Sequence, residues 1–72
     1  MYEYNEQELE LKNLMNSIGK KGDTHYSGDT LFRALLRGHI RSVEQLKNTP
    51  KEELLKIRNL GDKRITYILN KI

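Results

Sequence analysis

The sequence contains no cysteine, and none of its apolar runs is long. Without cysteine, disulfide bonds and cysteine-ligated metals are excluded, so side-chain packing has to hold the fold together. No apolar run approaches the roughly 20 residues of a transmembrane helix, and no signal-peptide pattern is present. We therefore expect a cytoplasmic protein without a membrane partner.

The sequence also lacks the residue groupings that catalysis or metal binding requires. No nucleophile–base pair, carboxylate dyad or metal cluster is visible. Asp23, His25 and Asp29 could ligate a metal, but no pair has helical i, i+4 spacing and His39 is distant. Gly19-Lys20 lacks the upstream glycine and parallel strand of a P-loop. We expect no enzyme, no metal site and no cofactor.

The 72 residues provide material for one small domain with a thin core, and their charges are unevenly distributed. Residues 1–19 carry four acids and one base, residues 20–41 carry five bases and two acids, and residues 42–72 carry seven bases and four acids. An acidic head on a basic body fits a nucleic-acid partner. A solvated surface of mixed charge is the plainer interpretation of the same composition.

The first predicted helix covers about residues 6–18. Asn5 and Glu8 have the spacing of a capping box, and Gly19 is placed to end the helix as a C′ residue. Apolar residues recur along one face of this helix, at Leu11, Leu14, Met15 and Ile18. We expect this face to join the core of the domain rather than to bind a partner.

Three further helix starts are marked by capping residues, after a loop at 19–29. They are Asp29 or Thr30 for a helix over about 30–37, Ser42 with Gln45 for a short helix from Val43, and Thr49 with Pro50 and Glu52 for a helix leading to the C-terminal turn. No segment shows the alternation of a strand. The sequence predicts an all-α class.

The predicted architecture is a compact bundle of four to five short helices that share one core. Each apolar stripe is too narrow to stand alone, so all of them need one another for burial. We expect a single domain over 1–72, with an added amphipathic helix at 1–18. The predicted core consists of Leu14, Ile18, Leu35, Leu36, Ile40, Leu46, Leu55, Leu60, Ile65, Ile68 and Leu69.

The C-terminal stretch has the pattern of the hairpin in a helix-hairpin-helix element. Asn59 and Gly61 are residue types that adopt positive φ readily, so the backbone can reverse there at little steric cost. A helix then begins, with Lys63 and Arg64 in its first turn. Unpaired N–H groups at a helix start, together with the helix dipole, form a seat for an anion such as phosphate. A plain connector is the alternative interpretation.

Residues 31–72 resemble the C-terminal domain of the bacterial RNA polymerase alpha subunit. The resemblance is carried by Leu36-Arg37-Gly38-His39-Ile40-Arg41-Ser42-Val43-Glu44-Gln45-Leu46 and by Glu53-Leu54-Leu55-Lys56-Ile57-Arg58-Asn59-Leu60-Gly61-Asp62-Lys63-Arg64. It implies a helical domain that binds the minor groove of promoter DNA through phosphate contacts and an inserted arginine.

Carried over by position, the resemblance implies DNA contacts at Arg33, Asn59, Gly61, Lys63 and Arg64. This sequence departs from the family at three of the relevant places. Thr30 stands where the family has its groove arginine, Asp62 where it prefers a base, and Arg64 where it usually has serine. Arg33 takes a neighbouring contact position that is usually held by asparagine.

Two functional hypotheses follow. The first is a small DNA-binding domain that grips phosphates of double-stranded DNA, in transcription. The second is a protein-interaction module of the same fold that docks on RNA polymerase or another transcription protein. Thr30 and Asp62 favour the second, and the turn at Asn59 to Gly61 with the basic body favours the first.

Overall fold

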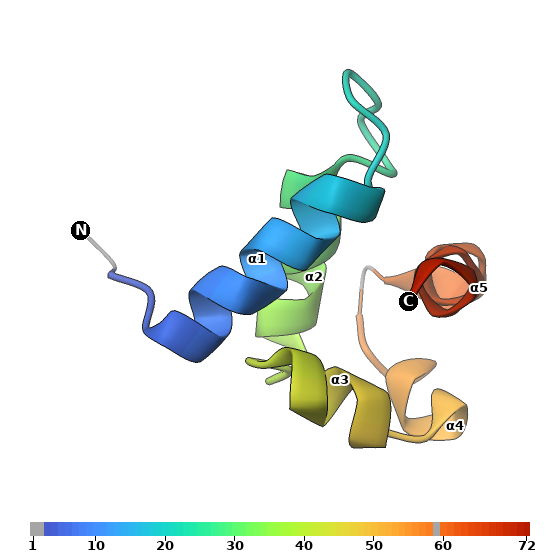
Figure 1. Ribbon diagram of the computed structural model, residues 1–72. Coiled ribbons are helices and arrows are strands. Elements are labelled where there is room, and N and C mark those ends of the chain that lie inside the picture. Colours follow the sequence, from blue (N-terminus) through green and yellow to red (C-terminus); the bar gives the residue numbers. More distant parts are fainter. Residues whose placement is uncertain (1–2, 59) are drawn as a thin grey trace.

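The computed structural model describes residues 3–58 and 60–72, which form five short α-helices (Figure 1). These are α1 (Glu6–Ile18), α2 (Gly28–Arg37), α3 (Val43–Asn48), α4 (Lys51–Leu54) and α5 (Gly61–Lys71). The helix α1 packs on α2 and touches α3. In Figure 1, α5 lies on the side of the molecule away from the start of α1 and is viewed nearly along its axis. No strand occurs in these two ranges, so the predicted all-α class is confirmed.

The helix α1 has the predicted bounds and the predicted capping box. The side chain of Asn5 accepts a hydrogen bond from the N–H of Glu8 at 2.8 Å, and the Glu8 carboxylate accepts one from the N–H of Asn5 at 3.0 Å. Glu8 is nevertheless buried, with 2% of its surface exposed. A buried carboxylate needs partners, and Arg41 Nη1 lies 3.5 Å from Glu8 Oε2. This pair ties the start of α1 to the segment between α2 and α3.

The helix α2 begins two residues earlier than predicted, and neither Asp29 nor Thr30 is its N-cap. Ser27 takes that position, and its hydroxyl accepts a hydrogen bond from the N–H of Thr30 at 3.2 Å. Serine, aspartate and threonine are all good N-caps, so the local sequence offers several possible starts. The position of α2 against α1 selects one of them.

The end of α1 and the start of α2 meet at two glycines. A Cβ atom on Gly19 would collide with the backbone of Gly28, and a Cβ on Gly28 would collide with the backbone of Asn16. Gly19 ends α1 as predicted, but its φ of −69° and ψ of 160° are extended rather than left-handed. Gly19 is needed for close packing rather than for a positive φ.

The capping predictions for the two central helices are only partly right. The hydroxyl of Ser42 caps α3 by accepting from the N–H of Gln45 at 3.0 Å. The amide oxygen of Gln45 accepts from the N–H of Arg41 instead of closing a box with Ser42. Thr49 does not cap α4, because its hydroxyl donates back to the Gln45 carbonyl at 2.6 Å. Pro50 precedes the helix and accepts its first backbone hydrogen bonds.

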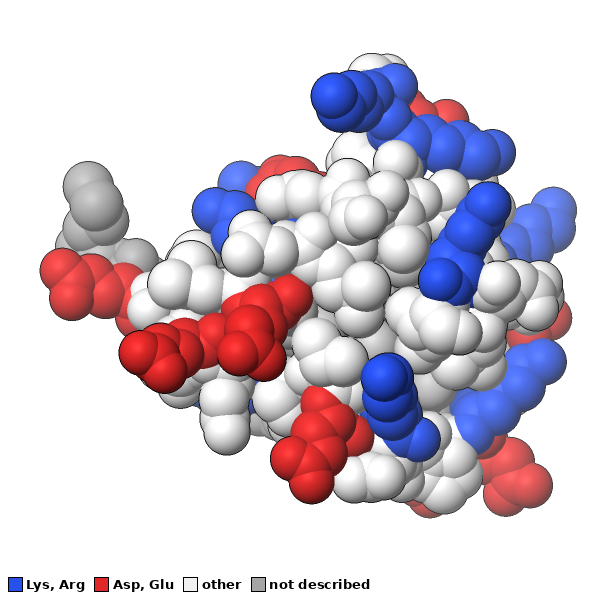
Figure 2. All heavy atoms as spheres, viewed as in Figure 1, with Lys and Arg blue, Asp and Glu red and all other residues white. Residues whose placement is uncertain are grey.

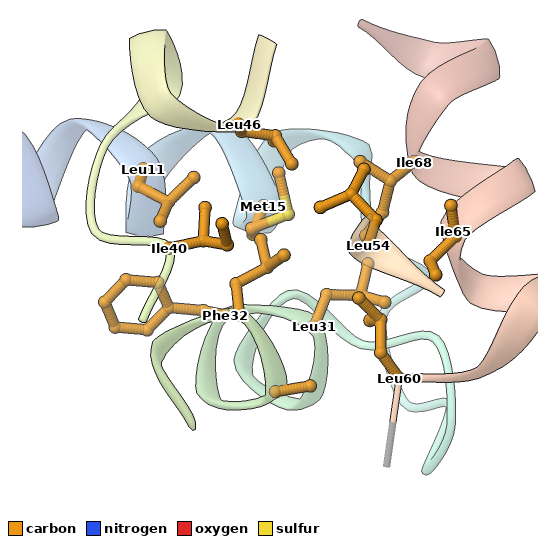
Figure 3. Close-up of a cluster of buried hydrophobic side chains, with 12 residues drawn as sticks. Leu11, Met15, Leu31, Phe32, Ile40, Leu46, Leu54, Leu60, Ile65 and Ile68 are labelled. Atoms are coloured by element: carbon orange, nitrogen blue, oxygen red, sulfur yellow. The ribbon is translucent and has the colours of Figure 1, made fainter. Parts of the chain in front are cut away.

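All five helices and the turns beside them contribute to one hydrophobic core (Figure 3). The buried apolar residues are Leu11, Met15, Leu31, Phe32, Ala34, Leu35, Ile40, Leu46, Leu54, Leu60, Ile65 and Ile68. Six predicted core residues are among them: Leu35, Ile40, Leu46, Leu60, Ile65 and Ile68. Four others lie at the edge of the core and are half-buried: Leu14, Ile18, Leu36 and Leu69.

Leu55 was predicted to be in the core, and this is wrong. Its side chain is 43% exposed, whereas that of Leu54 is 1% exposed. Successive residues of a helix point about 100° apart, so a one-turn helix such as α4 can direct only one of two adjacent leucines inward. None of the helices in the described ranges is long and apolar enough to cross a membrane.

The two adjacent leucines at the end of α4, Leu54 and Leu55, provide a matched test of the core. Replacing Leu54 by alanine should lower the free energy of unfolding by about 2–5 kcal/mol, because it leaves a cavity in the core. The same change at Leu55 should cost about 0.5 kcal/mol, as at other surface positions. Urea or thermal melts of both variants would measure this. Equal losses would contradict the assignment of the buried face.

The added helix α1 should be required for folding. Leu11 and Met15 are fully buried against the rest of the core, so removal of residues 1–18 exposes the faces that they cover. We expect the remaining fragment to lose its cooperative thermal transition, because a domain with so small a core is only marginally stable. An unchanged melt of the fragment would show that α1 is only an appendage.

Candidate functional site

The loop between α1 and α2 has a fixed backbone structure. Asp23 Oδ1 accepts hydrogen bonds from the N–H groups of His25 at 2.7 Å and Tyr26 at 2.8 Å. These two bonds, with that of Tyr26 the stronger influence, lower the pKa of the Asp23 carboxyl. The carbonyl of Tyr26 also accepts from the N–H of Lys20 at 2.8 Å. We refer to residues 20–27 as the clamp loop.

Thr30 connects the clamp loop to the first turn of α2. Its hydroxyl donates to the Thr24 carbonyl at 3.1 Å and accepts from the Ser27 hydroxyl at 2.8 Å. Thr30, to which the resemblance assigns the position of the family's groove arginine, therefore has a local structural role in this protein. The sequence alone shows that the arginine is missing, but not that Thr30 makes these local hydrogen bonds.

The hairpin prediction is supported where the structure describes it. Gly61 has φ of 78°, the left-handed conformation that glycine adopts without strain. Leu60, which precedes α5, is buried, and this leucine at the N-cap position makes no side-chain hydrogen bond to the first N–H groups of the helix. Asn59, the other predicted turn residue and DNA contact, lies outside the described residues.

Arg64, in the first turn of α5, contacts the clamp loop. Its Nε donates to the His25 carbonyl at 2.7 Å, and its Nη2 lies 3.0 Å from His25 Nδ1. The two residues are 39 positions apart in the sequence. This contact attaches the hairpin to a loop that the sequence pattern did not connect with it.

A pair of tyrosines joins the clamp loop to α5. The rings of Tyr26 and Tyr67 have centroids 5.2 Å apart, and the Tyr67 hydroxyl donates to the Ile18 carbonyl at the end of α1. Lys20 lies over both rings, at 5.2 and 5.5 Å from their centroids. Tyr67 is half-buried against the core, so Tyr26 packs at the edge of the core through this contact.

Two neighbouring clefts meet at Arg64. The first, which we call the α2 cleft, has a volume of about 350 Å³ and is lined by Asp29, Thr30, Arg33, Ala34, Arg37 and Arg64. The second, the hairpin cleft, has about 480 Å³ and is lined by His25, Tyr26, Leu60, Gly61, Asp62, Lys63 and Arg64. Four of the five predicted site residues therefore line one continuous surface. Arg37 and His25 also line this surface, and no sequence pattern pointed to them as DNA contacts.

The charges at this surface are partly paired. Arg33 Nε lies 3.2 Å from Asp29 Oδ2, and both side chains are largely exposed. Asp62, in the first turn of α5, lies 4.0 Å from the Lys51 ammonium. Exposed ion pairs of this type contribute little to stability, so a ligand can displace them at low cost. Lys63 is exposed beside them.

Acidic and basic side chains gather over different elements on the face of the molecule shown in Figure 2. Figure 2 shows acidic side chains gathered over the start of α1, and Lys and Arg side chains gathered over the clamp loop and the side of α5. This matches the acidic head and basic body of the sequence. A polyanion would be attracted to the end of the molecule that carries the two clefts.

The residues considered as metal ligands have other partners. Asp23 accepts backbone hydrogen bonds, His25 contacts Arg64, and Asp29 pairs with Arg33. Within the described part of the protein, no three acidic, histidine or cysteine side chains are grouped as they would be around a metal ion.

A helix start beside two neighbouring clefts with basic linings, on an all-helical domain, suits an anionic ligand such as nucleic acid. Residues 31–72 match the model of a family described as the C-terminal domain of the bacterial RNA polymerase alpha subunit. The matched range is more than half of the sequence, and the protein belongs to this family. No curated protein and no solved structure matches it.

Family membership identifies a transcription-related DNA-binding domain, whose partners are DNA and the transcription machinery. The family domain is not itself catalytic. The matched range begins after the clamp loop and includes α5. The surface described above is therefore formed partly by residues that the family match does not cover.

The pKa of Asp23 provides a test of the clamp loop. Because the folded pKa is depressed, the ionised carboxylate stabilises the loop above the ordinary value of about 3.9, and this contribution disappears as pH falls through the lower folded pKa. In an NMR titration, the amide signals of His25 and Tyr26 should shift together with a midpoint below about 3.9. In Asp23→Asn this step should vanish. A midpoint at or above the ordinary value would contradict the hydrogen bonding described.

Proposed function

We propose that this domain binds the phosphate backbone of double-stranded DNA along the surface formed by the α2 cleft and the hairpin cleft. The observation that carries the proposal is the meeting of the two clefts at Arg64. Arg33 and Arg37 lie on one side of it, and Gly61 and Lys63 lie on the other. Family membership supports a role in transcription.

The chemistry of this surface suits a phosphate backbone. The first turn of α5 offers backbone N–H groups at its positive dipole end, and Leu60 at the N-cap position has no side-chain hydrogen bond to them. Guanidinium groups add charge-assisted hydrogen bonds that match the geometry of phosphate oxygens. Asp62 reduces the positive potential, and its exposed pairing with Lys51 places a second cation near the same helix start.

We infer that recognition depends on phosphates more than on bases. Thr30 is engaged with the clamp loop and is too short to enter a groove as the family arginine does. Arg33, one turn further along α2, is the residue nearest in position that has enough length. Contacts to phosphates carry no direct sequence information. The expected outcome is modest sequence preference with strong salt dependence.

The second candidate is a protein-interaction module that docks on RNA polymerase or another transcription protein. The specific observation in its favour is the pairing of Arg33 with Asp29 and of Lys51 with Asp62, which lowers the positive potential of the surface. An absence of DNA binding in the experiment below would select this candidate.

Duplex binding measured by fluorescence anisotropy tests the proposal. With about four phosphate contacts, affinity should fall roughly a hundredfold between 50 and 200 mM salt. Lys63→Glu should weaken binding and make the salt dependence shallower by about one contact, because it removes one cation from the hairpin cleft. The fold should survive, since acidic residues suit the first turn of a helix.

Lys47→Glu is the matched control, with the same change of net charge on exposed α3. The helix α3 lies at the end of the molecule opposite to the clamp loop (Figure 1). This variant should keep the parental salt dependence. A parent protein that fails to bind duplex at about 50 mM salt would refute the proposal, as would equal losses in the two variants.

A further inference from the structure

The clamp loop precedes the family-matched range, yet it makes the contact with Arg64 inside that range. Arg64 lines both clefts, and no other described residue is shared between them. Whatever fixes its side chain therefore influences both halves of the proposed DNA surface. In the described structure, His25 provides two of the groups that Arg64 contacts.

The chemistry of this contact defines which group accepts. Arginine has only donors, so a hydrogen bond between Arg64 Nη2 and the ring requires Nδ1 of His25 to be the acceptor. The Nε and Nη2 atoms of Arg64 lie on the same edge of the planar guanidinium. The carbonyl and the ring of His25 together bind that edge, which fixes the plane of the guanidinium as well as its position.

Three sets of contacts hold the clamp loop in place. Asp23 accepts the N–H groups of His25 and Tyr26, Thr30 holds the Thr24 carbonyl, and Tyr26 packs on Tyr67. His25 is thus presented by a braced loop rather than by a free one. The low pKa of the Asp23 carboxyl agrees with this bracing.

We propose that His25 is a positioning residue that pre-orients Arg64 for phosphate binding, and that the clamp loop is the third structural part of the DNA surface. This inference rests on the proposed function. Its physical basis is entropic: a long side chain already held in place loses less freedom when it binds. The proposal assigns His25 an action through Arg64 and no contact with DNA of its own.

A double-mutant cycle separates this action from the alternatives. The parent, His25→Ala, Arg64→Ala and the double variant are titrated with the same duplex at one low salt concentration. His25→Ala should weaken binding by about two- to tenfold, the factor expected for immobilising one such side chain. In the Arg64→Ala background the same change should have no effect, because the residue it acts through is absent.

Two further variants sharpen the test. In His25→Asn, Oδ1 occupies the place of Nδ1 as an acceptor, so parental affinity should be largely restored. Asn13→Ala removes an exposed side chain of α1 that lines neither cleft and should bind DNA like the parent. The Arg64 Nη–H signals in nitrogen-15 NMR spectra, which report on the group facing the ring, should shift in His25→Ala and return toward their parental positions in His25→Asn.

Several results would overturn the inference while leaving the proposed function intact. One is an equal loss of affinity from His25→Ala with and without Arg64, which would indicate a direct contact or a general role in folding. Another is tighter binding by His25→Ala, which would mean that His25 withholds Arg64 from DNA. Unshifted Arg64 Nη–H signals in His25→Ala would show that the ring does not hold the guanidinium. If the parent binds no duplex, both proposals fail together.

Discussion

The close approach of α1 to α2 at Gly19 and Gly28 is the constraint on which the rest of the structure depends. No Cβ fits at either position, so the two helices meet at the level of their backbones. This contact brings Leu11 and Met15 of α1 into the core with α2. It also sets the two ends of the clamp loop, which extends beyond the helix ends in Figure 1. A side chain at either glycine would therefore disturb the core and the loop together.

The core and the candidate site are linked through α5. Ile65 and Ile68 anchor one face of this helix in the core, while its first turn carries Lys63 and Arg64 at the surface. Tyr67 ties the same helix to the end of α1, and Arg64 ties it to the clamp loop. The position of the basic groups is thus determined by the packing of Ile65 and Ile68 in the core and by the contacts of Arg64 and Tyr67 with the preceding loop and α1. Such a site on a rigid element keeps its geometry better than a site on a free loop.

Local patterns in the sequence predicted much of the fold. The capping box of α1, the serine cap of α3, the glycine turn before α5 and the all-helical class are interactions between near neighbours in the sequence. Such hydrogen bonds and φ preferences depend on residue types a few positions apart, so a single sequence displays them. The hairpin motif and the resemblance likewise led to the family and to Arg33, Gly61, Lys63 and Arg64 of the candidate surface. Arg37 was missed because no capping or turn pattern distinguishes one exposed helix arginine from another.

The sequence by itself determined the helices, the turn at Gly61 and the family. The tertiary structure decided which of two adjacent leucines is buried, which of three capping residues starts α2, and that Glu8 lies inside the domain. It also decided that His25 meets Arg64. Each of these outcomes depends on how the helices lie relative to one another. Burial and long-range pairing depend on contacts between residues that are far apart in the sequence. Local sequence patterns do not specify which of these residues meet in space.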